Sequence, residues 1–390
     1  MSEETVIGSE NKGDCRVTVK PADALQVEVA TKNRDLFEPG IRKVVSEVVS
    51  QLGVEKVTVG VEDQGALDYV ILARVEAALR ALFSEATTSI RPSVDRVSSA
   101  RDRLRRSRLY APGNNPRLLV GIDLHGADCV LLDLEDSVPP AEKVAARTLV
   151  KHLLAAVDFP EEVWVRINPL DIYGRDDLAE VMRGRPHGIC LPKAESTEDV
   201  REVADTMTRI ENELGITDGT TWIMPIIETA KGVLHCEEIA AANDRVAVAA
   251  FGAEDFTRDV GAKRTSESLI LARSMIVAGA KAAGVQASDT VYANLEDEEG
   301  LINETRLARD LGFDGKGAIN PRQIAPIHAV FSPSEQEVEE ARRIVTAGEE
   351  GQAKGLGAIA IGGKMIDKPV LERARRTLKL AEMAEKGGRL

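Results

Sequence analysis

The sequence predicts a closed parallel barrel of the TIM (β/α)8 type, preceded by a small α+β domain and followed by a helical segment. Two observations support this prediction. From residue 105 onward, short apolar segments alternate regularly with segments of helical spacing. These apolar segments also lack alternating polar positions, which is typical of parallel strands covered by helices on both faces. A doubly wound sheet is the alternative, but no G-x-G-x-x-G motif follows the first strand.

The expected boundaries divide the chain into four parts. These are a small domain at 1–85, a linker at 86–104, the barrel at 105–325 and a C-terminal segment at 326–390. The linker is rich in Ser, Thr and Arg, contains Pro92 and lacks a sustained apolar period. The basic run that begins near its end, Arg101 to Arg108, is expected to be a solvated face, with contact to nucleotide phosphates as the less favoured alternative.

Apolar spacing within the small domain predicts the order β-β-α-β-α. Alternation predicts strands at 15–19, 25–30 and 56–63, and helical spacing predicts helices at 40–53 and 66–82. Gly53 fits the end of the first helix, because glycine commonly follows a helix C-terminus.

The barrel region contains eight candidate strands. They lie at 107–112, 128–135, 162–167, 187–193, 222–227, 246–252, 290–295 and 316–320. Helical segments lie between them, for example 142–157 and 199–215. The C-terminal segment is helical on both sides of a glycine-rich stretch at 353–367.

Composition disfavours several classes of protein. A net charge of −14 disfavours a nucleic-acid binder, which normally carries a basic patch. No apolar run approaches the ~20 residues of a membrane helix, and the N-terminus is polar and acidic, unlike a signal peptide. The scattered cysteines argue against a disulfide framework or a zinc site. We therefore expect a cytoplasmic protein.

The polar side chains at the predicted strand ends mark the candidate site, because a TIM barrel places its active site at the carboxyl ends of the strands. They are Asn115, Asp133, Glu135, Asp136, Arg166, Asn168, Lys193, Glu228, Glu254, Asp255, Asn294, Glu296 and Asn320. Such a set, rich in carboxylates and without His or Cys, favours Mg²⁺ and a substrate with chelating oxygens, such as a hydroxy acid or keto acid. Taken alone, Asp136 or Asp255 could equally cap the following helix.

Several motifs in this region together resemble one enzyme family. In chain order they are RSRLYAPGNNPRLL, GADCVLLDLEDSVPPAEKVAAR, VRINPLD, LPKAES, IIETAKGV, FGAEDFTRDVG and GFDGKGAINPRQI. They resemble the citrate lyase β subunits and the wider CitE-like acyl-CoA lyases, which are related to the HpcH/HpaI aldolases. The ending GGKMIDKPVLERARR resembles the C-terminal lid of that family. The segment 37–79 of the small domain resembles the citrate lyase γ subunit, an acyl carrier protein, so the two subunits look fused.

The resemblance implies a role for individual residues. Glu228 and Asp255 would be the Mg²⁺ ligands. Arg166 would contact the carbonyl or enolate oxygen, and Glu135 would orient Arg166 and take part in proton transfer. Asp367 in the lid would act as acid or base, in relatives from a neighbouring subunit. The contacts expected for the nucleotide or pantetheine end of a thioester are Tyr110, Asn115, Arg117 and Lys193.

The activity that the resemblance implies is a Mg²⁺-dependent carbon–carbon cleavage of a 3-hydroxyacyl thioester. Citryl-CoA, or a citryl group on a carrier, would split to oxaloacetate and an acetyl thioester. The alternatives are a citramalyl-CoA or malyl-CoA lyase with a vestigial carrier domain, and a non-catalytic carrier or scaffold subunit. Relatives that share the lid between subunits suggest a homo-oligomer, a trimer or hexamer.

The small domain departs from the carrier pattern at one position. Citrate lyase carriers bear a CoA-derived prosthetic group on a serine, in a segment like G-T-L-E-S-G-D. This chain has GSENKGD at 8–14, which places Lys12 where the serine is expected. Ser9 is the nearby hydroxyl that could carry the group. Whether the protein works with an α-type subunit of a citrate lyase complex depends on that modification.

Overall fold

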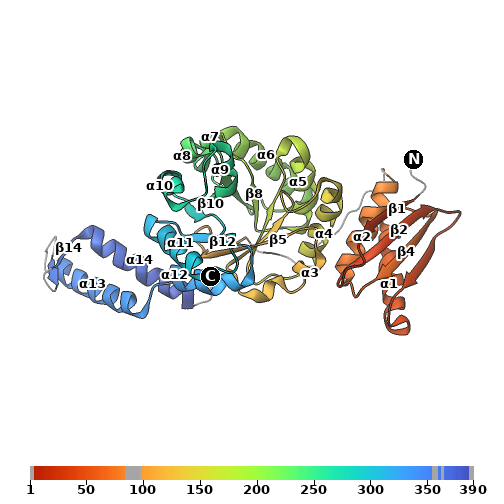
Figure 1. The fold of residues 1–390 in the computed structure, drawn as a ribbon, viewed down its shortest axis with the longest axis horizontal. Helices are drawn as coiled ribbons and strands as arrows, with labels where there is room; N and C mark the ends of the chain where they lie inside the picture. The colour runs from red at the N-terminus through yellow and green to blue at the C-terminus, as the bar shows by residue number, and fades with distance from the viewer. Residues whose placement is uncertain (1–3, 84–95, 97, 354–358, 362–363, 386–390) are drawn as a thin grey trace.

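The computed structural model describes residues 4–83, 96, 98–353, 359–361 and 364–385. It contains a small N-terminal domain, a barrel and a C-terminal hairpin of two long helices, with the small domain and the hairpin on opposite sides of the barrel (Figure 1). None of the described helices has the length and apolar character needed to cross a bilayer. Most of the predicted linker lies outside the described residues.

The small domain is a four-stranded sheet, in the order β1-β2-β4-β3, covered by two helices. Its elements are β1 (Thr5–Gly8), β2 (Cys15–Pro21), β3 (Gln26–Ala30), α1 (Arg34–Gln51), β4 (Val57–Asp63) and α2 (Asp68–Leu82). The short edge strand β1 was not predicted. The predicted first helix starts too late, because Pro39, which lies inside α1, resembles a helix start.

A closed barrel of eight parallel strands occupies residues 107–318, so the predicted fold class is confirmed. Each strand hydrogen-bonds to the next in sequence, and the last pairs with the first through Lys316–Ala318 and Ser107–Leu109. The strands are β5 (Ser107–Pro112), β6 (Cys129–Asp133), β7 (Glu162–Arg166), β8 (Gly188–Leu191), β9 (Trp222–Ile227), β10 (Val248–Phe251), β11 (Gln286–Asp289) and β12 (Gly315–Ala318).

Helices surround the barrel and cover its outer face with aliphatic side chains. They are α3 (Pro116–Leu119), α4 (Lys143–Ala156), α5 (Arg175–Val181), α6 (Thr197–Leu214), α7 (Ala230–Leu234), α8 (Cys236–Ala240), α9 (Ala253–Val260), α10 (Ser266–Ala282), α11 (Glu298–Leu311) and α12 (Ile324–Phe331). A second apolar cluster, which includes Leu131, Trp164 and Met224, fills the interior. The barrel is therefore a packed core, and its chemistry must lie at one end.

The seventh strand was predicted at the wrong place. The expected strand at 290–295 lies in the loop after the true strand, Gln286–Asp289, so Asn294 and Glu296 are not at a strand end. Strand propensity favoured the Thr-Val-Tyr segment, but propensity depends strongly on tertiary context. Asp289 can occupy a buried strand position because Arg273 and Lys316 pair with it, each at 2.9 Å.

The basic run Arg101 to Arg108 is solvated only at its start, where Arg101 is exposed. Arg105, Arg106 and Arg108 are all buried. Arg105 pairs with Glu162 at 2.6 Å, and Arg106 pairs with Asp128 at 2.8 Å. A charge run was expected to face water, but here two of its guanidiniums neutralise acids at the amino ends of the strands. Arg105 and Arg106, which are bound to these acids, are not available to contact a phosphate.

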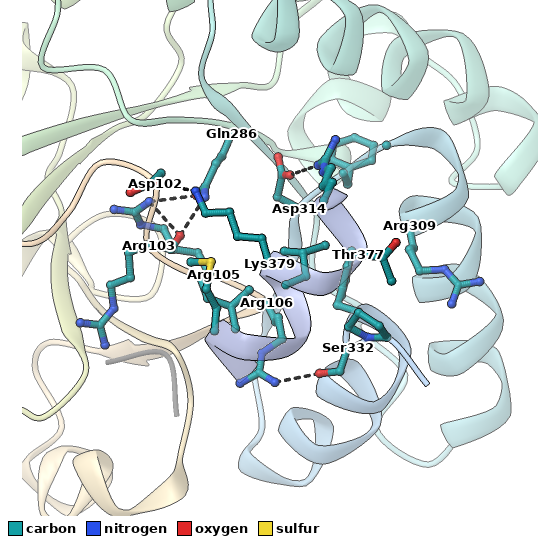
Figure 2. Close-up of a pocket in the computed structure, with 18 of the residues that line it drawn as sticks. Asp102, Arg103, Arg105, Arg106, Gln286, Arg309, Asp314, Ser332, Thr377 and Lys379 are labelled. Carbon is teal, nitrogen blue, oxygen red and sulfur yellow. Dashed lines mark hydrogen bonds and ion pairs between the residues drawn. The ribbon is translucent and has the colours of Figure 1, made fainter. Parts of the chain in front are cut away.

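The C-terminal segment forms a projecting arm. Helix α13 (Glu335–Ala353) leads to a short hairpin of β13 (Ile359–Ile361) and β14 (Lys364–Ile366), and α14 (Lys368–Glu385) returns to the barrel. The tip with β14 lies far from the barrel (Figure 1). The other end of α14 closes a cavity of about 490 Å³ at the amino ends of the strands, where Lys379 pairs with Asp102 at 2.7 Å (Figure 2).

We expect Glu162→Gln to lower the free energy of unfolding of the barrel by about 3–5 kcal/mol at pH 7, because Arg105 would keep a buried charge without its carboxylate. Burial alone would raise the pKa of Glu162, but the Arg105 charge and several hydrogen bonds lower it to about 2. A carboxyl with a depressed folded pKa stabilises the fold above its unfolded pKa, about 4.3, and this contribution is lost as the pH falls through the folded pKa.

The difference in the free energy of unfolding between wild type and Glu162→Gln should therefore have its full value at pH 7 and shrink as the pH falls from about 4 toward 2. Urea unfolding followed by tryptophan emission measures it, since both tryptophans, Trp164 and Trp222, belong to the barrel. Glu202→Gln, which removes an exposed ion pair with Arg175, is the control and should cost less than about 1 kcal/mol. A difference that stays constant down to pH 2.5 would contradict the assignment.

Candidate active site

A cavity of about 420 Å³ opens at the carboxyl ends of the barrel strands. It is lined on one side by the ends of β5 to β7 and on the other by the ends of β9 to β12. Charged groups from both sides face it, among them Asp133, Arg166, Glu228 and Asp255. The closure of the barrel brings these residues together, although they are up to 122 positions apart in the chain, the separation of Asp133 and Asp255.

Arg166, the last residue of β7, is held in a fixed orientation. Its Nε and Nη2 donate to the two carboxylate oxygens of Asp133, at 2.6 and 2.8 Å. Its guanidinium lies over the Tyr110 ring, with the carbon 5.6 Å from the ring centre. Burial alone would raise the pKa of Asp133, but the charge and hydrogen bonds of Arg166 lower it, so the acid stays ionised. The free edge of the guanidinium, Nη1, is left for other partners.

Glu135 is one of those partners. Its Oε2 lies 3.0 Å from Arg166 Nη1, and its Oε1 accepts a hydrogen bond from Lys193 Nζ at 2.5 Å. The carboxyl is buried, and this burial raises its pKa even though Arg166 and Lys193 oppose the shift. Asp133 thus fixes the arginine, while Glu135 is the more readily protonated acid beside it. Such a group suits proton transfer.

Lys193 connects Glu135 to Glu228, although neither Lys193 nor Glu135 is among the residues that line the cavity. It has φ 50°, in the left-handed region that a side chain other than glycine rarely adopts. This conformation lets its backbone N–H donate to Glu228 Oε1 at 2.8 Å while its Nζ reaches Glu135. Non-glycine residues in this region cost free energy and cluster at functional sites.

Glu228 and Asp255 form an acidic pair across the cavity from Arg166. Burial, then the charges of Asp255 and Glu135, raises the pKa of Glu228 to about 8. The Glu228 carboxylate packs against the backbone of Gly252, where a Cβ would overlap Oε2. Asp255, in the first turn of α9, forms an ion pair with Arg258. The site therefore brings negative charge together without enough fixed positive charge to balance it.

This donor set fits a hard cation such as Mg²⁺. Within the part of the chain that the structure describes, no three His, Cys, Asp or Glu side chains form a ready-made metal cage. Mg²⁺ commonly uses one or two carboxylates and completes its shell with water and substrate oxygens. Glu228 and Asp255 could supply that pair, and a cation would remove the repulsion that raises the pKa of Glu228.

The other expected site residues divide into two groups. Tyr110 lines the cavity under Arg166, whereas Asn115 and Arg117 are exposed at the start of α3, beside the mouth. The assignment of these residues and of Lys193 to a thioester stays a prediction. Asp367 is not among the cavity residues: it lies at the tip of the arm, where Oδ1 accepts from Val370 N at 3.2 Å.

Ser9 belongs to the turn between β1 and β2 of the small domain, where its hydroxyl donates to Asp14 at 2.8 Å. Its modification stays a prediction. Asp136, one of the two acids that could cap a following helix, is exposed and precedes the next helical segment by four residues. Asp133 accepts the hydrogen bonds of the loop after β6, from the backbone N–H groups of Glu135 at 2.9 Å and Ser137 at 3.2 Å.

Sequence reasoning missed some contributors to the site. Gly252 leaves room for Glu228, and Ser137 supports Asp133 with both its backbone and its hydroxyl. Thr290, directly after the true seventh strand, accepts from Ala253 N at 3.1 Å and so fixes the start of α9. Gly252 could have been noticed from its place between a strand and the GAED acids. The role of Thr290 required the correct seventh strand.

Comparison with known families identifies the barrel. The family described as HpcH/HpaI aldolase/citrate lyase matches residues 106–321. The chain belongs to this family. An acyl carrier family described as malonate decarboxylase delta subunit (MdcD) matches residues 2–82. The family resemblance predicted from the sequence motifs, a lyase barrel behind a carrier-like domain, is confirmed.

Individual relatives agree with this placement. The chain is 43% identical over 284 residues to citrate lyase subunit beta of Leuconostoc mesenteroides subsp. cremoris, covering 72% of this chain and 94% of that protein. It is 35% identical to human mitochondrial citramalyl-CoA lyase, covering 71% of this chain and 85% of the relative. A structure of CitE from Mycobacterium tuberculosis with magnesium, acetoacetate and coenzyme A is 32% identical with a TM-score of 0.61, covering 73% of this chain and all of the other.

We expect Asp133→Asn to lower the free energy of unfolding of the barrel by about 3 kcal/mol, because the buried Arg166 would lose the carboxylate that binds two of its nitrogens and keep only Glu135 as a close ionic partner. Asp136→Asn is the matched control. Its side chain is 57% exposed and lies 3.9 Å from Arg166 Nη1, so its effect should stay within about 0.5 kcal/mol. Urea unfolding followed by tryptophan emission compares the two. Equal losses would show that Asp133 does not hold the arginine.

Proposed function

We propose that this protein is a Mg²⁺-dependent carbon–carbon lyase that cleaves a citryl thioester, with citryl-CoA as substrate, to oxaloacetate and an acetyl thioester. The observation that carries the proposal is a fixed guanidinium facing an acidic pair across one cavity. Arg166 is oriented by Asp133, and Glu228 with Asp255 lies opposite. A retro-Claisen cleavage needs both features, since a hydroxyl must lose a proton as negative charge develops on a thioester enolate.

Arg166 would stabilise the enolate. Cleavage leaves the electron pair of the broken bond on the acetyl thioester, whose oxygen then carries negative charge. Donors that are already in place stabilise such charge without reorganising at the moment of reaction. Arg166 meets this requirement because two of its nitrogens are bound to Asp133 and its Nη1 edge remains directed toward Glu135 and the cavity.

Glu135 would take part in moving the proton. Its burial raises its pKa, and Lys193 and Arg166 hold both of its oxygens in place. An acid whose pKa lies nearer to neutrality exchanges protons more effectively at physiological pH than an ordinary carboxylate. No lysine Schiff base is required, because the thioester itself accepts the electrons.

Glu228 and Asp255 would hold the metal. Bound Mg²⁺ would supply the Lewis acidity that lowers the pKa of the substrate hydroxyl. The carboxylates would fix the position of the hydroxy acid part of the substrate relative to Arg166. Because a carboxyl must be deprotonated to bind a metal, the raised pKa of Glu228 would couple its ionisation to metal binding.

Asp367 would protonate the enolate from the arm of another subunit. The tip of the arm lies far from the barrel of its own chain (Figure 1), so a cavity could receive Asp367 only from a neighbour. We therefore propose a homo-oligomer, a trimer or hexamer, that shares its lids. The four described cysteines are all unpaired, which suits the reducing cytoplasm in which we place the enzyme.

Citryl is the preferred acyl group because the identity is higher to a citrate lyase β subunit than to a citramalyl-CoA lyase. Citramalyl-CoA and malyl-CoA are the competing substrates. A free CoA thioester is favoured over a carrier-bound one, because Lys12 replaces the expected serine and the Ser9 hydroxyl is bound to Asp14. In the alternative, Ser9 carries a CoA-derived group and the chain works with an α-type subunit. A carrier or scaffold without catalysis is the third reading.

We expect the protein to cleave citryl-CoA with Mg²⁺ and to lose this activity on chelation. Arg166→Ala should lower kcat by about 10²–10³-fold, as the loss of an oxyanion donor does. Asp255→Asn should abolish Mg²⁺-dependent turnover and weaken Mg²⁺ binding in calorimetry, because one of two ionic ligands is lost. Release of oxaloacetate, coupled to a dehydrogenase, measures the rate.

Arg175→Lys and Glu202→Gln, which alter an exposed surface pair, are the controls and should retain wild-type rates. Citramalyl-CoA and malyl-CoA are assayed in parallel to rank the substrates. Intact mass of the protein from its native cell is measured first. An added CoA-derived group would favour the subunit complex, and wild-type rates in either site variant would refute the proposed site.

We also expect the lid to act between subunits. Arg166→Ala has a disabled cavity and an intact lid, whereas Asp367→Asn has an intact cavity and a disabled lid. Each should be inactive alone, but co-expression should restore part of the activity, because mixed oligomers place an intact lid over an intact cavity. Oxaloacetate release by the purified mixed oligomers is the measurement. Absence of recovery in oligomers that contain both variants would contradict lid sharing.

A further inference from the structure

Helix α2 of the small domain belongs to two cores at once. Ile71, Val75 and Leu79 pack in the core of the small sheet. Tyr69, Val70 and Ala73, on another face of the helix, are buried in the core that covers the outside of the barrel. A carrier that travels between partners needs an interface that opens easily. This interface shares a helix and buries apolar side chains on both sides.

Charged groups strengthen the same interface. Glu76 of α2 is fully buried and binds Lys151 Nζ at 2.5 Å and His152 Nε2 at 2.6 Å, both on α4 of the barrel. Farther along α2, Arg80 pairs with Glu180 at 2.7 Å. Opening the interface would expose its apolar side chains to water, which is strongly unfavourable, and would break these ion pairs. The small domain is therefore docked on the barrel as a fixed unit.

Arg74 extends this docking to the catalytic end of the barrel. Its Nε and Nη2 bind the two carboxylate oxygens of Asp14, at 2.9 and 3.1 Å, and both residues are 3% exposed. Nη2 also donates to the backbone oxygen of Asn114 at 3.1 Å. Asp14 ends the segment that in carriers bears the prosthetic group. One guanidinium thus joins that segment to the loop that follows β5.

The loop held by Arg74 adjoins the catalytic arginine. Gly113 N donates to the backbone oxygen of Asp133 at 2.7 Å, and a Cβ at Gly113 would lie 2.8 Å from that oxygen. The loop is therefore packed closely between Arg74 on one side and Asp133 on the other. Asn115, the expected thioester contact, is the next residue after the Arg74 contact.

We propose that Arg74 is a positioning residue for the lyase, and that the carrier-like domain braces the 113–115 loop instead of carrying the substrate. The part of the inference that concerns substrate binding rests on the proposed function, in which this loop contacts the thioester. Arg74 touches neither substrate nor reacting atoms. It acts through Asn114, by fixing the backbone from which Asn115 is presented.

Arg74→Lys tests the proposal. Lysine keeps a cation for Asp14, but one ammonium cannot reproduce the fork that binds both Asp14 oxygens and the Asn114 oxygen. Amide hydrogen exchange in a peptide covering 110–119 should become faster. KM for citryl-CoA should rise about tenfold, the effect of losing one hydrogen bond from a charged donor, while kcat stays within about twofold because Arg166 is untouched.

Arg80→Lys is the matched control. The substitution is the same and lies on the same helix, and it weakens the contact of Arg80 with Glu180 between the domains. Because Arg80 does not contact the 113–115 loop, amide exchange in 110–119 and KM should not change. Asp14→Asn is a second variant, which removes the carboxylate that orients Arg74 but keeps the Arg74 donor for the Asn114 oxygen. Exchange in 110–119 should rise by less than in Arg74→Lys.

The proposal is overturned if Arg74→Lys leaves exchange in 110–119 unchanged, or if either of the other variants accelerates it equally. An unchanged KM with faster exchange would refute the role in substrate binding. Because exchange requires no turnover, it tests the brace even if the wild type cleaves no hydroxyacyl-CoA, an outcome that would remove the proposed function alone.

Discussion

The pairing of Arg166 with Asp133 is the interaction on which the site depends. A buried guanidinium without a carboxylate would be unstable, and a carboxylate at the end of β6 without a cation would be protonated. The bidentate contact between Arg166 and Asp133 compensates both charges, and it leaves Arg166 Nη1 facing Glu135. The neighbouring strands β6 and β7 are in register at these two residues, so the backbone itself sets the spacing.

The remaining charges follow from that arrangement. Glu135 lies on the free edge of the arginine and shares its other oxygen with Lys193. The unusual backbone of Lys193 in turn holds Glu228, whose pKa is raised by burial and by Asp255. The arginine compensates acids on one side of the cavity. On the other side, Asp255 pairs with the exposed Arg258, and Glu228 forms no ion pair among the described residues. A divalent cation with open coordination positions would complete the other side, as the chemistry of a hydroxyacyl substrate requires.

If Arg74 braces the 113–115 loop, the small domain keeps a carrier-like fold in a different role. Residues 10–12 of the attachment segment are exposed, but a mobile carrier also needs a weak interface. Here the corresponding segment is bound through Asp14 and Arg74, and α2 is buried against the barrel by apolar side chains and by the ion pairs of Glu76. The replacement of the expected serine by Lys12 is consistent with this fixed arrangement.

The sequence by itself determined the barrel, the order of its parts, the family and the polar residues at most strand ends, because periodicity and motifs are local along the chain. It also indicated an oxygen-rich site. It misplaced the seventh strand, since Asp289 is stabilised there by Arg273 and Lys316 from other elements. It expected a solvated basic run, although Arg105 and Arg106 meet their acids only when the barrel closes.

Only the tertiary structure decided which carboxylate holds Arg166. Asp133 and Glu135 are both acids of one short motif. The direction of each side chain at the end of β6 decides that Asp133 binds Arg166 Nε and that Glu135 lies at Nη1. The structure likewise separated Asp367 from the cavity of its own chain and fixed the carrier-like domain on the barrel. These outcomes depend on contacts between residues far apart in sequence. Local sequence patterns do not specify the geometry of such contacts.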